Sequence, residues 1–146
     1  MGRKRASFKI KDLPRPKKLG KVFGAKKRDS NEKYCAKLLS NFGYDIIFLP
    51  ESKISGVHTP DILWKRDGKG WEIKTIIGSN NTTVQKALHH ATKQSNYVIL
   101  NITGTKRDIN RVRYDVIDYI SRRRTSIVEV VMLDKRKYCR IKRSDI

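Results

Sequence analysis

The chain has 146 residues, 38% of them hydrophobic and 33% charged, so it is long enough for one domain with its own core. Lysine and arginine number 34 against 14 aspartate and glutamate, which gives a formal net charge of +20. A charge of this size favours polyanionic partners, with nucleic acid first and an acidic protein second. No apolar run is long enough for a membrane span or a signal-peptide core. The two cysteines form no CxxC pair, which argues against a disulfide framework and a structural zinc site.

The first 28 residues differ in composition from the rest of the chain. They carry twelve Lys or Arg and one acid, with Pro and Gly interspersed and little apolar periodicity. This composition predicts a flexible or loosely docked basic arm at 1–28, followed by a single domain at 29–146. Both a solvated tail and direct contact with nucleic acid remain open for the arm.

From residue 29 onward the hydrophobic pattern indicates a compact domain. An amphipathic stretch that stops at Gly43 predicts a helix. Runs of β-branched and aromatic residues predict strands, and the RDGKG segment at 66–70 predicts a turn between two of them. The expected order is helix, three strands, helix, strand, helix and two strands, over 29–43, 44–50, 61–67, 70–76, 81–94, 96–102, 109–124, 126–134 and 137–143. The fold class is therefore α/β, with a mixed sheet flanked by helices and an extra C-terminal helix and β-hairpin.

Charged residues are placed unusually around the predicted turn. Alternate residues of a strand share a face, so Glu72 and Lys74 point the same way, and a hairpin would bring Asp61 beside them. Two carboxylates that close repel each other, and a divalent cation relieves the repulsion by taking oxygen ligands. A neighbouring lysine can polarise a water against a phosphate. The pattern favours metal-assisted phosphodiester hydrolysis, with the ordinary alternation of a half-buried hairpin as the simpler alternative.

Glu32 is a further candidate, because it lies at the border of the first helix's buried stripe and could reach the same cluster. A capping box with Asp29 explains the same residue, since an acid three positions after a capping residue is typical of a helix start. The two interpretations remain open together.

These residues resemble the motif of the PD-(D/E)xK nuclease superfamily: Glu32 in the first helix, Pro60-Asp61, then Glu72-Ile73-Lys74, followed by a helix and an apolar strand. The resemblance implies a restriction-endonuclease-like αβββαβ core. It implies that Asp61, Glu72 and the Ile73 backbone carbonyl bind Mg²⁺, with Mn²⁺ or Zn²⁺ as alternatives, and that Lys74 orients the attacking water. It also implies that Glu32 belongs to the catalytic set. Gln94 and Thr75 are the accessory candidates.

Within that superfamily, residues 29–143 look like the C-terminal toxin domains of contact-dependent growth inhibition systems. The resemblance implies an RNase that acts on tRNA in the cytoplasm and an acidic immunity protein that silences it. It also implies either an excised domain of a larger exported protein or a stand-alone relative. A DNA endonuclease and a non-catalytic nucleic-acid binder are the alternatives. The expected nucleic-acid contacts are Lys86, His90, Arg122, Arg123 and Arg124.

Overall fold

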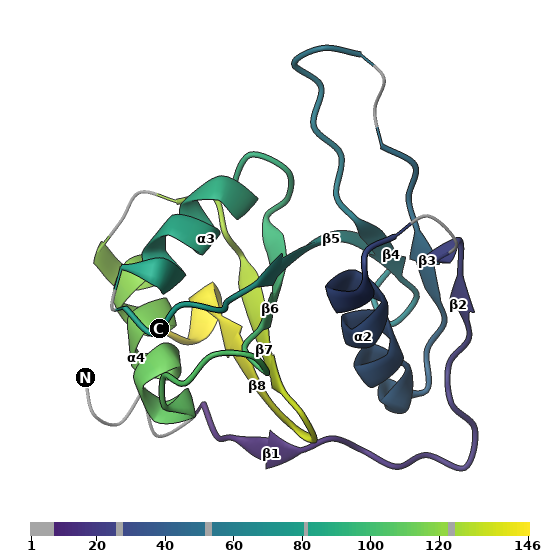
Figure 1. Cartoon of the computed structure of the whole chain (residues 1–146), viewed down its shortest axis with the longest axis horizontal. Helices are drawn as coiled ribbons and strands as arrows, with labels where there is room; N and C mark the ends of the chain where they lie inside the picture. Colours follow the sequence, from purple (N-terminus) through teal and green to yellow (C-terminus); the bar gives the residue numbers. More distant parts are fainter. Residues whose placement is uncertain (1–7, 26–27, 52–53, 81, 123–124) are drawn as a thin grey trace.

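The computed structural model describes residues 8–25, 28–51, 54–80, 82–122 and 125–146. Eight strands form one mixed sheet in the order β1-β8-β7-β6-β5-β4-β3-β2, with α2 on one side and α3 and α4 on the other (Figure 1). The strands are β1 (Lys11–Asp12), β2 (Val22–Phe23), β3 (Ile46–Phe48), β4 (Ile62–Trp64), β5 (Lys69–Thr75), β6 (Tyr97–Asn101), β7 (Glu129–Asp134) and β8 (Lys137–Lys142). The α-helices are α2 (Ser30–Leu39), α3 (Thr83–Ala91) and α4 (Ile109–Arg122), and the short 3₁₀ helices are η2 (Ser40–Phe42) and η3 (Arg143–Asp145).

The order of elements predicted from residue 29 onward is confirmed. Strands β5, β6 and β7 are parallel neighbours, while β3-β4-β5 and β7-β8 are antiparallel. The predicted turn at 66–70 joins β4 to β5, and Gly68 has the positive φ (70°) that this turn requires. The first helix ends through η2 at Gly43, whose φ of 86° gives the left-handed cap expected of a helix-ending glycine.

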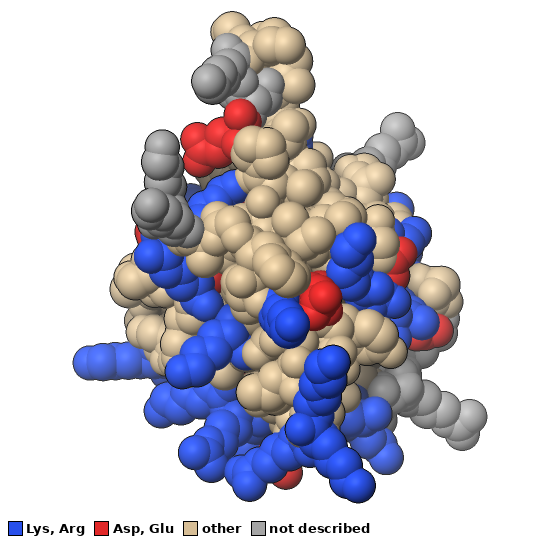
Figure 2. Space-filling model, turned by 90° about the vertical axis from the view of Figure 1, so that its right-hand side faces the viewer, with Lys and Arg blue, Asp and Glu red and all other residues tan. Residues whose placement is uncertain are grey.

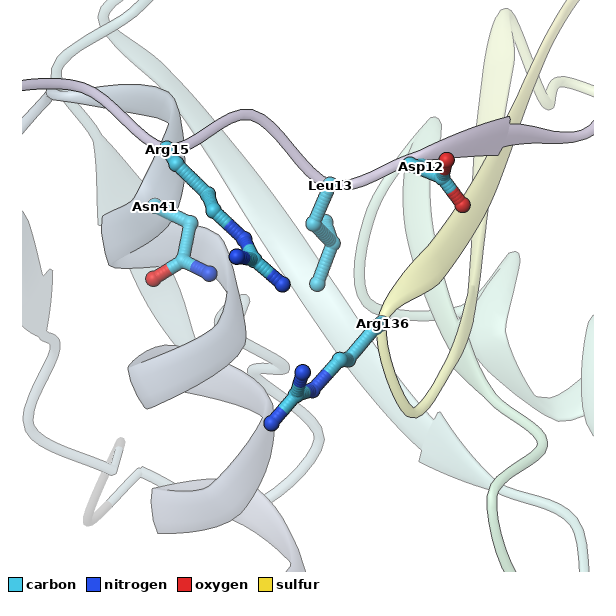
Figure 3. Close-up of a pocket in the computed structure, with 5 residues that line it drawn as sticks. All are labelled: Asp12, Leu13, Arg15, Asn41 and Arg136. Atoms are coloured by element: carbon cyan, nitrogen blue, oxygen red, sulfur yellow. The ribbon is translucent and has the colours of Figure 1, made fainter.

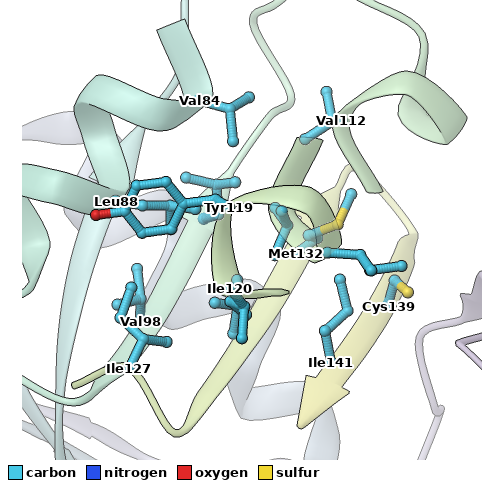
Figure 4. Close-up of a cluster of buried hydrophobic side chains, with 14 of the residues drawn as sticks. Val84, Leu88, Val98, Val112, Tyr119, Ile120, Ile127, Met132, Cys139 and Ile141 are labelled. Carbon is cyan, nitrogen blue, oxygen red and sulfur yellow. The ribbon is translucent and has the colours of Figure 1, made fainter. Parts of the chain in front are cut away.

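Each face of the sheet has its own hydrophobic core. Trp64, Trp71 and Ile73 pack with Cys35 and Leu39 under α2. The opposite core lies beneath α3 and α4 and is shown in Figure 4; it includes Val84, Leu88, Val98, Val112, Ile120 and Met132. Because Trp71 and Ile73 face α2, the alternating residues Glu72 and Lys74 point toward the α3 side. The shared face predicted for those two side chains is therefore confirmed.

The N-terminal stretch differs from the loosely attached arm expected for residues 1–28. In its described part, β1 pairs with β8 and β2 pairs with β3, so this segment extends both edges of the sheet. Phe8 and Leu13 are buried, at 3% and 7% exposed. Each strand is only two residues long and pairs with a distant segment, so the local pattern carried little sign of it. Residues 1–7 and 26–27 lie outside the described part.

Among the described residues no helix is long and apolar enough to cross a membrane. Both cysteines are buried and free.

Candidate active site

The β4–β5 hairpin places Asp61 opposite Glu72. Its register pairs Ile62 with Trp71, and one further step along both strands brings Asp61 to Glu72. Regular pairing stops there, because the Asp61 side chain takes the place of the next ladder bond: its Oδ2 accepts a hydrogen bond of 2.8 Å from the Ile73 amide. The main chain of Asp61 is fixed as well, since its amide donates to the Trp71 carbonyl and its carbonyl accepts from Leu49. The carboxylate is therefore held at the point where the two strands separate.

Glu72 is buried beside Asp61 and lacks a full set of partners. It is 3% exposed, and within the described residues its Oε1 has no hydrogen-bond partner. Its Oε2 lies 3.5 Å from Nζ of Lys74. Burial first, and then the Asp61 carboxylate, raise the pKa of Glu72 to about 8, and the Lys74 ammonium opposes this rise only in part. The site therefore favours a protonated Glu72 until another cation arrives.

Arg28 completes the cluster, and it was not among the site residues predicted from the sequence. Its Nη1 lies 3.5 Å from Oδ1 of Asp61 and 3.6 Å from Oε2 of Glu32. The guanidinium also donates to the Leu49 carbonyl and stacks over Phe48, with 5.2 Å between its central carbon and the ring centroid. The available signal was its spacing of four residues before Glu32, but it falls at the end of a stretch interpreted as a flexible arm.

The structure places Glu32 next to both features that the sequence left open, the helix cap at Asp29 and the carboxylate cluster. The Asp29 side chain accepts a 2.8 Å hydrogen bond from the Glu32 amide, which is the expected helix cap. The Glu32 side chain also shares Arg28 with Asp61. Burial, then the charges of Asp61 and Asp29, raise the pKa of Glu32, while Arg28 lowers it. Arg28 therefore links Glu32 to Asp61 by contacting both carboxylates.

Two carboxylates of this cluster, on Asp61 and Glu72, are the groups that could contribute oxygen ligands to a divalent cation. Within the described residues no group of three or more His, Cys, Asp and Glu side chains could hold a metal ion. Mg²⁺, however, is usually bound through one or two carboxylates and keeps several waters. The buried Oε1 of Glu72 is an oxygen without a partner, next to a second carboxylate. The amide and carbonyl of one strand residue point to the same edge, so the Ile73 carbonyl faces the Asp61 side as well.

The two accessory candidates, Gln94 and Thr75, lie just after α3 and at the end of β5. Gln94 follows the end of α3 at Ala91, and the adjacent Ser95 donates a 2.6 Å hydrogen bond to the Gly70 carbonyl. That carbonyl lies two residues before Glu72 on β5. The helix α3 ends three residues earlier than the sequence pattern predicted, and Gln94 stays an accessory candidate. Thr75 lies at the end of β5, where its Oγ1 accepts a 3.5 Å hydrogen bond from Asn101.

The expected nucleic-acid contacts are exposed on the two helices of the α3 side. Lys86 and His90 lie four residues apart on α3, and Arg122 ends α4 in an ion pair with Asp118 at 2.6 Å. Arg123 and Arg124 lie outside the described residues.

Comparisons with known proteins bear on the fold and the family. The family model of the contact-dependent growth inhibition CdiA C-terminal domain matches residues 58–138, which contain Asp61, Glu72 and Lys74. Among solved structures, the chain is similar to the CdiA-CT/CdiI toxin and immunity complex from Burkholderia pseudomallei, with 14% identity and a TM-score of 0.59. The similarity covers 83% of this chain and 98% of that chain, and at this identity it concerns the fold. No curated protein matches the chain.

Proposed function

The chain belongs to the contact-dependent growth inhibition CdiA C-terminal domain family, and on that premise we propose that it is a toxin domain that hydrolyses phosphodiester bonds in nucleic acid. The observation that carries this proposal is the buried Glu72, whose Oε1 has no partner among the described residues, beside Asp61 and Lys74. A carboxylate left in this state is costly to the fold unless it has a ligand to bind. The assignment to the PD-(D/E)xK nucleases is part of the proposal.

Asp61, Glu72 and the Ile73 carbonyl would hold a divalent cation, with Mg²⁺ expected and Mn²⁺ or Zn²⁺ as alternatives. When bound, such an ion neutralises charge on the phosphate and lowers the pKa of a coordinated water. The position of Asp61 supports this role, because the Ile73 amide holds its Oδ2 in place. The other oxygen, Oδ1, is directed at Arg28.

Lys74 supplies the remaining polar group of the proposed reaction. Its side chain is 27% exposed, so it can reach a substrate while its ammonium stays 3.5 Å from Glu72. In this position it can hold the attacking water by a hydrogen bond and stabilise charge that develops on the phosphate. Arg28 and Glu32 position Asp61 in this scheme rather than touch the reacting atoms.

The proposed substrate is tRNA. The net charge of +20 suits any nucleic acid, and the preference for tRNA rests on the likeness of residues 29–143 to tRNA-cleaving toxin domains. DNA is therefore the second arm of the test.

The test is cleavage of total tRNA and of plasmid DNA by purified protein, with Mg²⁺, Mn²⁺ or Zn²⁺ and with EDTA. We expect tRNA cleavage that EDTA abolishes, and a loss of about 100-fold or more in Asp61→Asn, Glu72→Gln and Lys74→Met. The control is Glu51→Gln, which changes the same charge at an exposed loop position and should cleave at the wild-type rate. EDTA-resistant cleavage, or wild-type turnover in Glu72→Gln, would overturn the proposal, and cleavage of DNA alone would replace its substrate.

We also propose an acidic protein partner that silences the domain, because the structural neighbour is a toxin in complex with an immunity protein. Opposite charge would steer the encounter with a chain of +20. The test compares growth of cells that express wild type or Glu72→Gln without a partner. Toxicity limited to wild type supports the proposal, and free expression of an active wild type contradicts it.

A further inference from the structure

One part of the α2 side of the sheet is not covered by α2. On β8, Cys139 and Ile141 are buried in the core of the opposite face, so Tyr138, Arg140 and Lys142 point to the α2 side. Successive members of this row are about 6.6 Å apart, which is the rise of two strand residues. The row therefore presents two cations and an aromatic ring beyond the edge of the helix.

A hollow of about 390 Å³ lies over this row. The rings of Phe42 and Tyr138 line it, together with one acid, Asp145. Five cations complete the lining: Lys9, Lys11, Arg66, Arg140 and Lys142. Segments from both ends of the chain and from the β4–β5 turn meet here, so the fold gathers cations that are distant in sequence.

A buried carboxylate fixes two of these cations. Glu129 is 5% exposed, and its oxygens accept hydrogen bonds from Arg66 at 3.1 Å and from Nη2 of Arg140 at 3.2 Å. Arg66 also stacks on Trp64, with 4.1 Å between its central carbon and the ring centroid. Guanidinium groups held in this way lose little further freedom when they bind a ligand.

A second hollow of about 620 Å³ lies by the tip of the β7–β8 hairpin, and two of its lining residues are next in sequence to residues that line the first. Arg15, Asn41 and Arg136 line it with Leu13 and Asp12, and Figure 3 shows the Asp12 carboxylate away from both guanidinium groups. The two hollows are contiguous along the chain, since Asn41 precedes Phe42 and Asp12 follows Lys11. We call them together the basic seam. Figure 2 shows Lys and Arg crowded over the lower part of the molecule, where the segment after β1 and the hairpin tip lie in Figure 1.

Most cations of the seam carry uncompensated charge. In the described part of the chain no ion pair involves Lys11, Arg15, Arg136 or Lys142. Like charges this close are unfavourable in the free protein, and a polyanion relieves the repulsion.

We infer that the basic seam binds the phosphate backbone of an RNA strand, at a distance from the Asp61–Glu72 cluster. The inference deepens the proposed function, on which it rests, by naming where the substrate is held. Asn41 lies nine residues after Glu32, about 14 Å along a helix, and Glu72 points to the other side of the sheet. The expected contacts on α3 and α4 also lie on that other side, so the seam is an additional surface.

The chemistry of the seam favours nucleic acid over an acidic protein. Guanidinium forks match phosphate oxygens in a bidentate geometry, and Arg66 and Arg140 are already oriented by Glu129. Aromatic rings between cations are the usual means of binding single strands, because bases stack on them irrespective of sequence. Phe42 and Tyr138 supply such rings inside the hollow.

The test measures binding in EDTA, where no turnover is needed, so its outcome is separate from that of the nuclease proposal. The probes are labelled single-stranded oligouridine and, as an acidic polypeptide, polyglutamate of similar charge. The variant is Lys11→Gln/Arg136→Gln/Lys142→Gln, which leaves the Glu129 pairs intact. The matched control is Lys93→Gln/Lys106→Gln/Arg111→Gln, three exposed cations on the α3 side. Thermal unfolding checks that both variants are folded.

We expect the seam variant to bind oligouridine at least about tenfold more weakly and to lose about 2 from the log-log salt slope, at roughly 0.7 per phosphate. The control should keep most of both. Equal weakening in the two variants would reduce the seam to general charge and overturn the inference. Unchanged oligouridine binding with lost polyglutamate binding would assign the surface to an acidic protein and overturn it as well.

Discussion

Glu129 and Glu72 are both buried on this sheet, but they differ in how completely their carboxyl oxygens are paired. Glu129 on β7 is 5% exposed, and both of its oxygens accept hydrogen bonds from Arg66 or Arg140. Glu72 on β5 is 3% exposed, and among the residues that the structure describes it pairs with one cation, Lys74, at 3.5 Å. Its Oε1 has no partner in the described part of the chain, and a second carboxylate stands beside it.

The difference separates a carboxylate that serves the fold from one that is available for chemistry. A buried charge that is fully paired organises its surroundings. A buried carboxyl that is poorly paired raises its own pKa and stays ready for a cation. The predictions below use the two residues as a matched pair wherever possible.

The largest expected effect is on stability. Glu129→Gln removes the charge that holds two guanidinium groups, so the free energy of unfolding should fall by about 2 kcal/mol. Glu72→Gln has the same shape change and relieves repulsion with Asp61, so it should be neutral or slightly stabilising at pH 8. Urea unfolding of the three proteins in EDTA measures both. Equal losses of unfolding free energy in the two variants would show that Glu72 and Glu129 contribute to the fold in the same way.

The pH dependence of stability sharpens the same contrast. The pKa of Glu72 is raised from 4.5 to about 8 in the folded chain. The folded state therefore binds more protons than the unfolded state across this window, and stability is lost as pH rises from 4.5 to 8. In EDTA, Glu72→Gln should lose less stability than wild type over that range, by at least about 1 kcal/mol, because each pH unit between the two pKa values corresponds to about 1 kcal/mol. Parallel curves for the two proteins would show that Glu72 titrates normally.

The two regions should respond differently to substrate length. If the basic seam holds the strand, the seam variant should raise KM for tRNA about tenfold, while kcat changes little, because the contact is equal in ground and transition states. A dinucleotide has a single phosphodiester, so it cannot occupy the cluster and the seam together, and its cleavage should be unchanged. A matching loss on the short substrate would place those cations at the reaction centre instead.

The smallest expected effect concerns Arg28. Its guanidinium already neutralises Asp61 and Glu32 in part. Arg28→Met should therefore tighten Mn²⁺ binding by about fivefold, or ~1 kcal/mol. Lys33→Met, on the exposed face of α2, is the control and should leave the affinity for Mn²⁺ unchanged. Weaker Mn²⁺ binding in Arg28→Met would mean that Arg28 holds the carboxylates in position for the metal and does not compete with the metal for them.

Local pattern was enough to predict the elements and the core of the site. The Asp67-Gly68 turn fixed the hairpin, and alternation along β5 then placed Glu72 and Lys74 on the face that Asp61 reaches. Periodicity likewise predicted a helix at 81–94, where the structure has α3 (Thr83–Ala91). Each of these inferences needs only neighbours within one or two elements.

Features that depend on long-range contacts were missed. The strands β1 and β2 have two residues each and exist only through pairing with β8 and β3. Arg28 was assigned to an arm because its partner Asp61 is 33 positions away. The seam joins Arg66 to Arg140 through Glu129, a relation that no local pattern carries. The end of α3 was also predicted imprecisely, since the helix stops at Ala91, three residues before Gln94.

The most direct measurement is calorimetric titration of Mn²⁺ into wild type, Glu72→Gln and Glu129→Gln at pH 7.5, in two buffers of different ionisation enthalpy. We expect one bound ion per chain in wild type and in Glu129→Gln, and none in Glu72→Gln. Wild type should also release a proton on binding, because the raised pKa keeps a large share of the Glu72 carboxyl protonated at this pH. Equal binding in all three proteins, or binding without proton release, would contradict the claim that Glu72 is poised for a cation.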